Sequence, residues 1–258
     1  MPAFAHLIQL DSQWEDRTAS HERAKKLIAE AAPGPGDLIV LPEMFSTGFS
    51  KNIAITTQTE AAEDETFLAE TARAFQCTVV GGVVCASDNS GAPFNQSVVV
   101  GPDGNVLARY RKQRLFSYTG ESDHYQPGTE GPSLFEWNDL QVAPLICYDL
   151  RFPELARAAV RAGAEALIYI AAWPVKRQEH WITLLKARAI ENQAFVIGVN
   201  RCGKEPESTY GGRSMAVDPH GVVIGDAGAA ETSVGVRIYP NVVAEWRNEF
   251  PAVTEFLA

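Results

Sequence analysis

The sequence of 258 residues predicts an α/β fold in which helices pack on the outer faces of β-sheets. Apolar runs of the length of buried strands alternate with amphipathic helical stretches along the chain. Two hairpins, each with a turn that contains glycine, predict that antiparallel strands join the parallel ones. No linker, low-complexity tract or short repeat divides this series, so we expect a single domain over residues 1–258.

In the first half of the chain, apolar runs bounded by Gly or Pro predict strands, and apolar residues three or four apart predict helices. Leu27, Ile28 and Ala31 share one face of a helix that runs from about Thr18 to Ala32, and PGPG ends it. The expected elements are a strand at 3–11, that helix, a strand at 37–45, a helix around Leu68, Ala72 and Phe75, a strand at 78–86, and a hairpin at 94–112.

In the second half, a polar stretch at 114–132 with several Gly and Pro residues predicts a long loop. Pro153 lies near the first turn of the next helix, a position that proline favours. The expected elements after the loop are a strand at 140–149, a helix at 152–163, a strand at 166–173, a helix at 180–194, a strand at 195–202, a hairpin at 214–226 and a strand at 232–239.

Composition and charge argue against several classes of partner. The formal net charge is −10, whereas a protein that binds nucleic acid or an anionic membrane surface needs a basic face. No apolar run is long enough to span a bilayer, and the N-terminus lacks the pattern of a signal peptide. The four cysteines form no CxxC pair, so we expect neither disulfides nor a zinc site, and we expect a reducing cytoplasm.

Cys147 is the candidate nucleophile. In LICYDLRFPELAR, at 145–157, it ends an apparent strand and directly precedes a helix, where unpaired N–H groups favour a thiolate. An ordinary thiol has a pKa of about 8.5, so a catalytic cysteine needs this help or a nearby base. The alternative is that Cys147 only packs, as buried cysteines usually do. For Cys77, Cys85 and Cys202, which lie in or beside apolar strands, packing is the expected role.

Three charged residues accompany it. Glu43 follows a buried strand immediately, at the end where open sheets place ligand sites, and desolvation there suits a carboxylate to proton transfer. Lys112 ends the second strand of the first hairpin, and Glu121 lies in the polar loop. Taken singly, each has an ordinary explanation: a solvated strand end for Glu43, a surface lysine for Lys112, and a loop acid for Glu121.

Three blocks that contain these residues resemble the signature blocks of the nitrilase, or carbon–nitrogen hydrolase, superfamily. They are LPEMFSTGF at 41–49, YRKQRLF with GESDHYQPG at 110–128, and LICYDLRFPELAR. The resemblance extends to AAWP at 171–174, HW at 180–181, ARAIENQAFVIGVNRCG at 187–203 and the hairpin GGRSMAVDPHGVVIG at 211–225. The chain is most similar to the omega-amidase branch, which hydrolyses the terminal amide of dicarboxylic acid monoamides such as 2-oxoglutaramate. Arg114 departs from the pattern, because many relatives carry His there.

The resemblance implies a four-layer αββα sandwich and a homodimer. It implies that Cys147 is the nucleophile, Glu43 the general base, Lys112 an oxyanion stabiliser and Glu121 a supporting carboxylate. The backbone N–H of Tyr148 is expected to share the oxyanion with Lys112. A small-molecule amide is the expected substrate, without metal or cofactor. The residues that we expect at the substrate are Trp173, from the AAWP block, and the cations Arg114, Arg151, Lys176 and Arg177, one of which would bind the distal carboxylate.

Three alternatives remain open on the sequence. Other amidases, nitrilases and N-carbamoyl amine or amino acid hydrolases of the superfamily use the same four residues. A Cys–His hydrolase would pair Cys147 with His180 or His124. A non-catalytic binding protein could have kept the fold.

Overall fold

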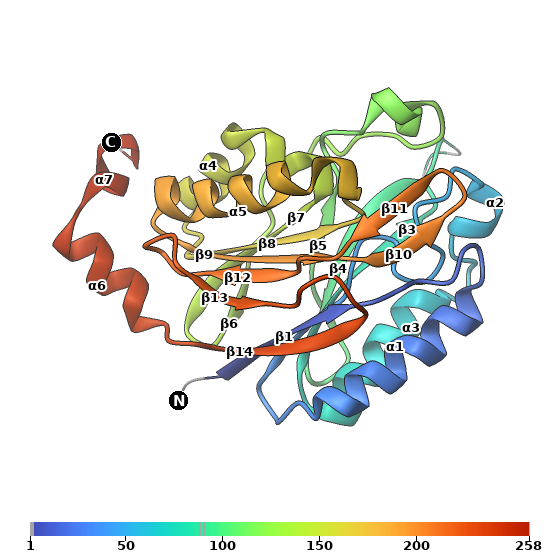
Figure 1. Ribbon diagram of the computed structural model, residues 1–258, viewed down its shortest axis with the longest axis horizontal. Helices are drawn as coiled ribbons and strands as arrows, with labels where there is room; N and C mark the ends of the chain where they lie inside the picture. Colours follow the sequence, from blue (N-terminus) through green and yellow to red (C-terminus); the bar gives the residue numbers. More distant parts are fainter. Residues whose placement is uncertain (1–2, 88, 90, 258) are drawn as a thin grey trace.

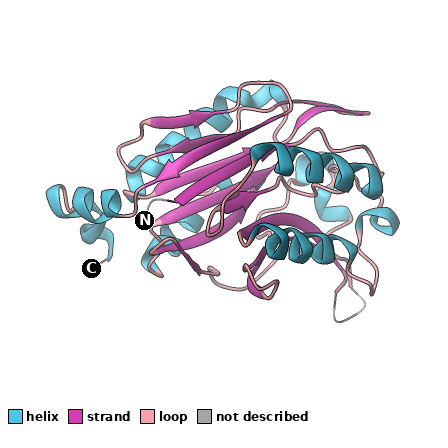
Figure 2. Cartoon of the chain, turned by 90° about the horizontal axis from the view of Figure 1, so that it is seen from below, coloured by secondary structure: helices cyan, strands magenta, loops and turns pink. Residues whose placement is uncertain are grey.

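The computed structural model describes residues 3–87, 89 and 91–257, and these form the predicted α/β architecture in four layers. Two six-stranded sheets face each other, and helices cover their outer faces (Figures 1 and 2). No helix in the described part of the chain combines the length and the apolar character needed to cross a membrane.

The first sheet combines the N-terminal strands with the last strand of the chain. β1, β2 and β3 are parallel, and the remaining neighbours pair antiparallel. Helices α1 (Arg17–Ala31) and α3 (Glu63–Phe75) cover the outer face, with the short α2 (Ile53–Thr56) beyond its edge (Figure 1). The strand order is β14 (Thr232–Ile238), β1 (Ala3–Gln9), β2 (Leu38–Val40), β3 (Thr78–Cys85), β4 (Phe94–Val100) and β5 (Val106–Arg111).

The second sheet holds the strands of the C-terminal half. β7, β8 and β9 are parallel, and the edges pair antiparallel. Helices α4 (Pro153–Arg161) and α5 (Gln178–Asn192) lie on its outer face (Figure 1). The order is β13 (Val223–Asp226), β12 (Met215–Val217), β9 (Phe195–Asn200), β8 (Ala166–Ala171), β7 (Leu140–Ile146) and β6 (Phe135–Trp137).

Two further parts lie outside the sheets. β10 (Cys202–Glu205) and β11 (Ser208–Gly211) form a separate hairpin, and α6 (Asn241–Glu249) and α7 (Ala252–Leu257) project from the body at the C-terminal end (Figure 1). The sequence analysis missed this hairpin, β6, and helices α2, α6 and α7. Three- and four-residue strands are too short for a periodic pattern to develop, and helices as short as α2 and α7 barely complete a turn or two.

The main core lies between the two sheets. Alternate residues of the first sheet point in opposite directions: Leu38 and Val40 of β2 join the core shared with the second sheet, whereas Ile39 packs toward α1 and α3. All three side chains are fully buried. Each such side chain contributes about 1.5–3 kcal/mol on burial. This packing keeps the strand ends, where the charged residues lie, in fixed relative positions.

The strand expected at 37–45 is the main difference in bounds, because β2 ends at Val40. The chain then leaves the sheet, and Met44 has a left-handed backbone with φ of 47°. Gly82 of β3 makes this path possible. It donates its N–H to the carbonyl of Pro42 at 3.1 Å and accepts from the N–H of Phe45 at 3.3 Å. The segment that carries Glu43 is therefore bonded directly to β3.

Gly82→Ala tests this contact. A Cβ at position 82 would lie 2.6 Å from Cα of Glu43 and 2.7 Å from the backbone N of Met44, and backbone atoms cannot rotate aside. We expect the free energy of unfolding to fall by about 1–3 kcal/mol, as overpacking does. Because Glu43 must move, we also expect catalytic activity to fall. Urea denaturation and activity assays measure the two effects.

Gly131→Ala is the matched control, because a Cβ there meets nothing within 4 Å. It should leave both stability and activity close to those of the wild type. Equal behaviour of the two variants would contradict the claim that Gly82 fixes the position of Glu43.

Candidate active site

Cys147 occupies a sharp corner between a strand and a helix. It is the first residue after β7 and begins a 3₁₀ helix at Cys147–Arg151, which leads into α4. Its φ of 46° lies in the left-handed region, which is unfavourable for a residue with a Cβ. The residue is 8% exposed and lines a cavity. The corner therefore presents a nearly buried thiol to a cavity.

Glu43 is fully buried and accepts three hydrogen bonds from neighbouring strands. Its Oε1 accepts from Nζ of Lys112 at 2.8 Å and from Nδ2 of Asn95 at 2.7 Å. Its Oε2 accepts from the backbone N–H of Ala172, directly after β8, at 2.8 Å. The carboxylate is thus fixed between the two sheets.

Glu121 is also fully buried, although it lies in the polar segment that separates the two halves of the sequence. Its Oε1 accepts from Lys112 at 2.8 Å and from Asn95 at 3.1 Å. Its Oε2 accepts from Lys112 at 2.9 Å and from the backbone N–H of Phe116 at 2.5 Å. The ordinary explanation of Glu121 as a solvated loop acid is therefore wrong.

Lys112 lies between the two carboxylates, and its side chain is fully buried. Burial alone would lower the pKa of the ammonium, but the charges of Glu121 and Glu43 outweigh it and raise the pKa well above its ordinary value. The group therefore stays charged. It also lines the cavity, where it lies 5.3 Å from the centre of the Phe49 ring.

The hydrogen bonds distinguish the two carboxylates. An ionised carboxylate has about four acceptor positions, and all four of Glu121 are taken by donors. Glu43 has three donors and keeps one position open. Of the two carboxylates, Glu43 has the larger effect on the pKa of the Cys147 thiol. Glu43 is therefore the carboxylate that can take up the thiol proton, and Glu121 serves to hold Lys112.

The thiol of Cys147 needs such a base. Burial raises its pKa well above the ordinary value, and the charge of Glu43 raises it further, while the charge of Lys112 lowers it. The resting cysteine therefore carries its proton at neutral pH. A proton acceptor in contact with the sulfur is required before it can attack.

Tyr148, whose backbone N–H is the second expected oxyanion donor, lies at the same corner as Cys147. Its backbone N–H lies in the first turn of the 3₁₀ helix, where such groups have no acceptor within the helix. Tyr148 lines the cavity, and its ring packs against Phe116 and Phe152, with centroids 4.9 and 5.2 Å apart. These contacts hold the backbone of the corner in place.

Asp149 is a buried residue that the sequence analysis missed. Its Oδ2 accepts from the N–H of Ile146 at 3.1 Å and from the hydroxyl of Tyr110 at 2.9 Å, and its Oδ1 accepts from the N–H of Arg114 at 2.9 Å. It thereby connects the corner at Cys147 to the segment that carries Lys112. The sequence feature that could have identified Asp149 was its position two residues after Cys147, inside the first turn of the helical segment.

The cavity in front of Cys147 has a volume of about 710 Å³. Trp173 lines it, as expected, and so do four cations besides Lys112: Lys51, Arg151, Lys176 and Arg177. The guanidinium of Arg151 lies 4.9 Å from the centroid of the Trp173 ring and contacts Nδ1 of His180 at 3.0 Å. Three carboxylates, Glu15, Glu205 and Glu207, line the cavity as well, and Glu207 pairs with Lys51 at 3.4 Å. The remaining cations are suited to bind a small anionic molecule.

The side chain of Arg114 is not part of this cavity, and its predicted place at the substrate is wrong. The guanidinium lies 3.4 Å from Glu154 and 5.1 Å from the centre of the Phe152 ring, and its side chain is 46% exposed. Only the backbone N–H of Arg114 serves the site, through Asp149. The pairing of Asp149 with this N–H turns the side chain outward from the corner.

Histidine is not the partner of Cys147. His180 contacts Arg151, and neither His180 nor His124 is among the residues that line the cavity. Among the described residues, no group of three or more His, Cys, Asp and Glu side chains is arranged to hold a metal ion. Glu43, which keeps one acceptor position open, is the better candidate for the acid–base group.

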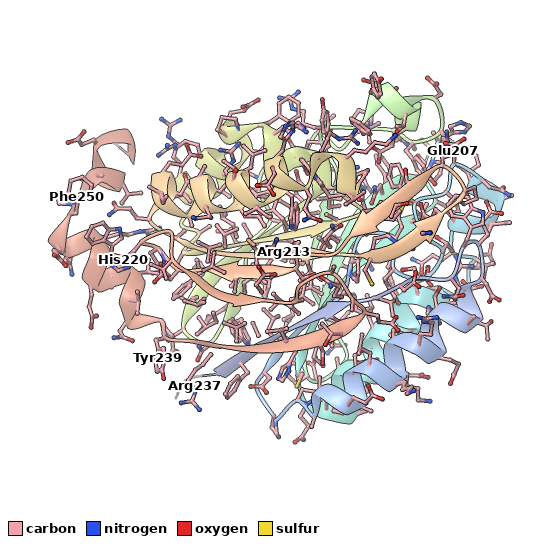
Figure 3. All side chains as sticks on the ribbon, in the orientation of Figure 1. Glu207, Arg213, His220, Arg237, Tyr239 and Phe250 are labelled. Carbon is pink, nitrogen blue, oxygen red and sulfur yellow. The ribbon has the colours of Figure 1, made fainter. Side chains whose placement is uncertain are left out.

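The missed β10–β11 hairpin forms one wall of the cavity. Glu205 and Tyr210 line it, and the Tyr210 hydroxyl donates to Glu205 at 2.6 Å. The buried guanidinium of Arg201 pairs with Glu205 and lies 4.5 Å from the centre of the Tyr210 ring. Glu207 lies at the tip of the hairpin (Figure 3). An ion pair inside the protein therefore fixes the position of this wall.

Comparison with known families and curated proteins gives a consistent result. The sequence model of the carbon–nitrogen hydrolase family matches residues 5–248. The chain is 33% identical to the 2-oxoglutaramate amidase of Bacillus subtilis, over 95% of this chain and 93% of that protein. It is 36% identical to the omega-amidase YafV of Yersinia enterocolitica, over 95% and 93% of the two chains.

Solved structures agree with these sequence matches. XC1258 from Xanthomonas campestris, a CN-hydrolase superfamily protein with an arsenic adduct in its active site, aligns with a TM-score of 0.91 at 29% identity, over 99% of this chain and 97% of that one. Nit3 of Saccharomyces cerevisiae, a member of branch 10 of the nitrilase superfamily, aligns with a TM-score of 0.87 at 27% identity, over 97% and 94%.

Glu121→Gln tests the role of Glu121 in holding Lys112. The amide removes one of the two charges beside Lys112 and turns an NH₂ group toward groups that are themselves donors. We expect turnover to fall on the order of a hundredfold, because misplacing a catalytic group has effects of this size. Glu130→Gln is the control, since Glu130 lies on the same loop and is exposed. Glu130→Gln should change the free energy of unfolding by no more than about 0.5 kcal/mol and should leave turnover close to that of the wild type. Near-normal turnover of Glu121→Gln would contradict the assigned role.

Asp149→Asn tests the buried charge at the corner. Burial raises the pKa of the Asp149 carboxyl to about 7, against about 3.9 in an unfolded chain. The folded protein thus keeps a proton that the unfolded chain releases, so the contribution of Asp149 to the free energy of unfolding falls as pH rises from about 4 to about 7 and is constant above that range.

Asparagine cannot titrate, so the stability of the wild type relative to Asp149→Asn should fall through this window by up to about 1.4 kcal/mol per pH unit. Urea denaturation of both proteins over a pH series measures the difference. If the difference in the free energy of unfolding between the wild type and Asp149→Asn does not change with pH, Asp149 is ionised throughout this pH range.

Proposed function

We propose that this chain, which belongs to the carbon–nitrogen hydrolase family, hydrolyses linear amides through a cysteine thioester and acts as an omega-amidase. One observation carries the proposal. Lys112 is held between Glu43 and Glu121 beside Cys147, at a cavity whose wall bears further cations. The cluster of Lys112 and the two carboxylates suits acyl transfer, and the further cations of the cavity suit a substrate that carries a carboxylate.

The first half of the reaction forms the thioester. Glu43 takes the proton from Sγ of Cys147 as the sulfur attacks the amide carbon. The developing oxyanion is stabilised by the Lys112 ammonium and by the N–H of Tyr148. Donors placed in advance in this way are worth roughly 3–4 kcal/mol each in acyl transfer. The protonated Glu43 then gives its proton to the leaving nitrogen, and ammonia departs.

The second half releases the acid. Glu43, now ionised again, takes a proton from a water molecule that attacks the thioester carbon. The same two donors stabilise the second oxyanion. When the intermediate collapses, the C–S bond breaks and Cys147 regains its proton from Glu43. Glu121 accepts its full set of hydrogen bonds throughout and takes no part in proton transfer.

The substrate class follows from the cations of the cavity. Lys51, Arg151, Lys176 and Arg177 line it, and a dicarboxylic acid monoamide needs such a partner for its distal carboxylate. Arg151 is the best placed for a fixed contact, because Trp173 and His180 hold its guanidinium. Relatives that are named for 2-oxoglutaramate support the same class.

We also propose that the chain acts as a single carbon–nitrogen hydrolase domain, as a homodimer, in the cytoplasm. Exposed apolar side chains support the dimer: Ile190, Val222 and Phe250 are each more than half exposed. His220 and Phe250 lie at the end of the molecule where α6 projects (Figure 3). The cysteines, all described and all free, are compatible with a reducing compartment. Light scattering on the purified protein measures the oligomeric state.

A substrate panel tests the function. Ammonia release should be fastest with 2-oxoglutaramate or a similar dicarboxylate monoamide, because the cations of the cavity can bind its distal carboxylate while the amide lies at Cys147. Aliphatic amides, nitriles and N-carbamoyl compounds should react far more slowly. Cys147→Ala should release no ammonia while it keeps its fold by circular dichroism. Comparable kcat/KM for a simple nitrile, or turnover by purified Cys147→Ala, would reject the proposal.

A further inference from the structure

Asn95 is in contact with both catalytic carboxylates. It lies in β4, next to the strand end that bears Lys112, and is 1% exposed. Its Nδ2 donates to Oε1 of Glu43 at 2.7 Å and to Oε1 of Glu121 at 3.1 Å. Its backbone carbonyl accepts from the N–H of Lys112 at 2.9 Å. One residue thus bonds to the carboxylates of Glu43 and Glu121 and to the backbone of Lys112.

The chemistry determines the orientation of the amide. The two protons of an Asn NH₂ group match the two carboxylate oxygens that face it. The reverse orientation would place Oδ1 against two negatively charged acceptors. In the observed orientation the buried Oδ1 has no hydrogen-bond partner within the described structure. An acceptor left without a partner is a cost that the two bonds from Nδ2 must outweigh.

The charges of the cluster explain why a neutral donor is needed there. Glu43 and Glu121 carry two negative charges and Lys112 one positive charge, and all three are fully buried. A buried excess of negative charge is unfavourable unless hydrogen-bond donors surround it. A second cation at position 95 would neutralise the excess negative charge. It would also hold Glu43 in a fixed ion pair and make its carboxylate a weaker base. An amide stabilises the ionised carboxylate without adding charge.

We propose that Asn95 is a positioning residue that holds Glu43 and Glu121 on either side of Lys112 and sets the pH at which Glu43 can act as the base. This inference rests on the proposed function and extends it, because the order of events at Cys147 depends on an ionised Glu43. Asn95 does not line the cavity, and it acts through the two carboxylates.

Asn95→Ala and Asn95→Asp test the inference by the pH dependence of kcat/KM. Without the amide donors the ionised base is less stable, so the acid limb of the profile should move to higher pH, by roughly one unit for Asn95→Ala. Asn95→Asp keeps the shape of the side chain but adds a third carboxyl, and its acid limb should move further in the same direction. For both variants kcat at neutral pH should fall at least tenfold, with little change in KM.

Gln96→Ala is the matched control. Gln96 follows Asn95 in β4, is also nearly buried, and directs its side chain to Sγ of Cys85, away from the site. It measures the general effect of truncating a buried amide on this strand and should leave the acid limb in place. If the acid limbs of both Asn95 variants coincide with that of the wild type, the inference is overturned and Asn95 has only a structural role. Asn95→Asp keeps the test available if Asn95→Ala does not fold.

A failure of the proposed function can be distinguished from a failure of the inference about Asn95. If the wild type releases ammonia from none of the amides, that function is wrong, whereas the inference about Asn95 can still be tested on the thiol. The rate of Cys147 alkylation by iodoacetamide, followed by peptide mass spectrometry across pH, should then show its acid limb displaced to higher pH in Asn95→Asp relative to the wild type. Superimposable alkylation profiles would overturn the inference.

Discussion

The ammonium of Lys112, buried between two carboxylates, is the interaction on which the rest of the site depends. Burial of a lysine is strongly unfavourable, and here the charges of Glu121 and Glu43 outweigh it. Removing either carboxylate would leave the buried ammonium with less compensating charge. The loss of stability would be much larger than the net stabilisation that the intact ion pair provides. The charge of Lys112 therefore requires both carboxylates to stay in place, and it gives the cavity that Cys147 lines a fixed positive group.

The fold explains how this cluster is assembled from distant parts of the chain. Glu43 follows β2, Lys112 follows β5 and Cys147 follows β7, so two sheets must pack face to face before the groups meet. Hydrogen bonds to the backbone then fix each group: Gly82 holds the segment of Glu43, the carbonyl of Asn95 holds that of Lys112, and the carboxylate of Asp149 holds the corner. These contacts involve residues that do not line the cavity, so changes well away from the substrate are expected to affect catalysis.

Much of the fold and part of the site could be predicted from the sequence. Apolar periodicity predicted most strands and helices. Glu43 and Cys147 were candidates because each follows a buried strand, and the resemblance to the nitrilase superfamily favoured a catalytic role over their ordinary explanations. Glu121 could not be separated from a loop acid, because a polar loop carries no periodicity that reports burial. Asn95 and Asp149 were missed since their roles depend on contacts across the fold. Arg114 was placed wrongly because proximity in sequence to Lys112 does not determine which way a side chain turns.

The charge of Lys112 can be measured directly by the ¹⁵Nζ chemical shift of the lysine side chains, with Lys112 assigned through Lys112→Arg. Ordinary lysines lose their proton near pH ~10.4. We expect the Lys112 signal to keep its ammonium shift while the exposed lysines titrate, over the whole pH range in which circular dichroism shows a folded protein. A Lys112 signal that moves to the neutral amine shift together with the exposed lysines, or at a lower pH, would contradict this expectation.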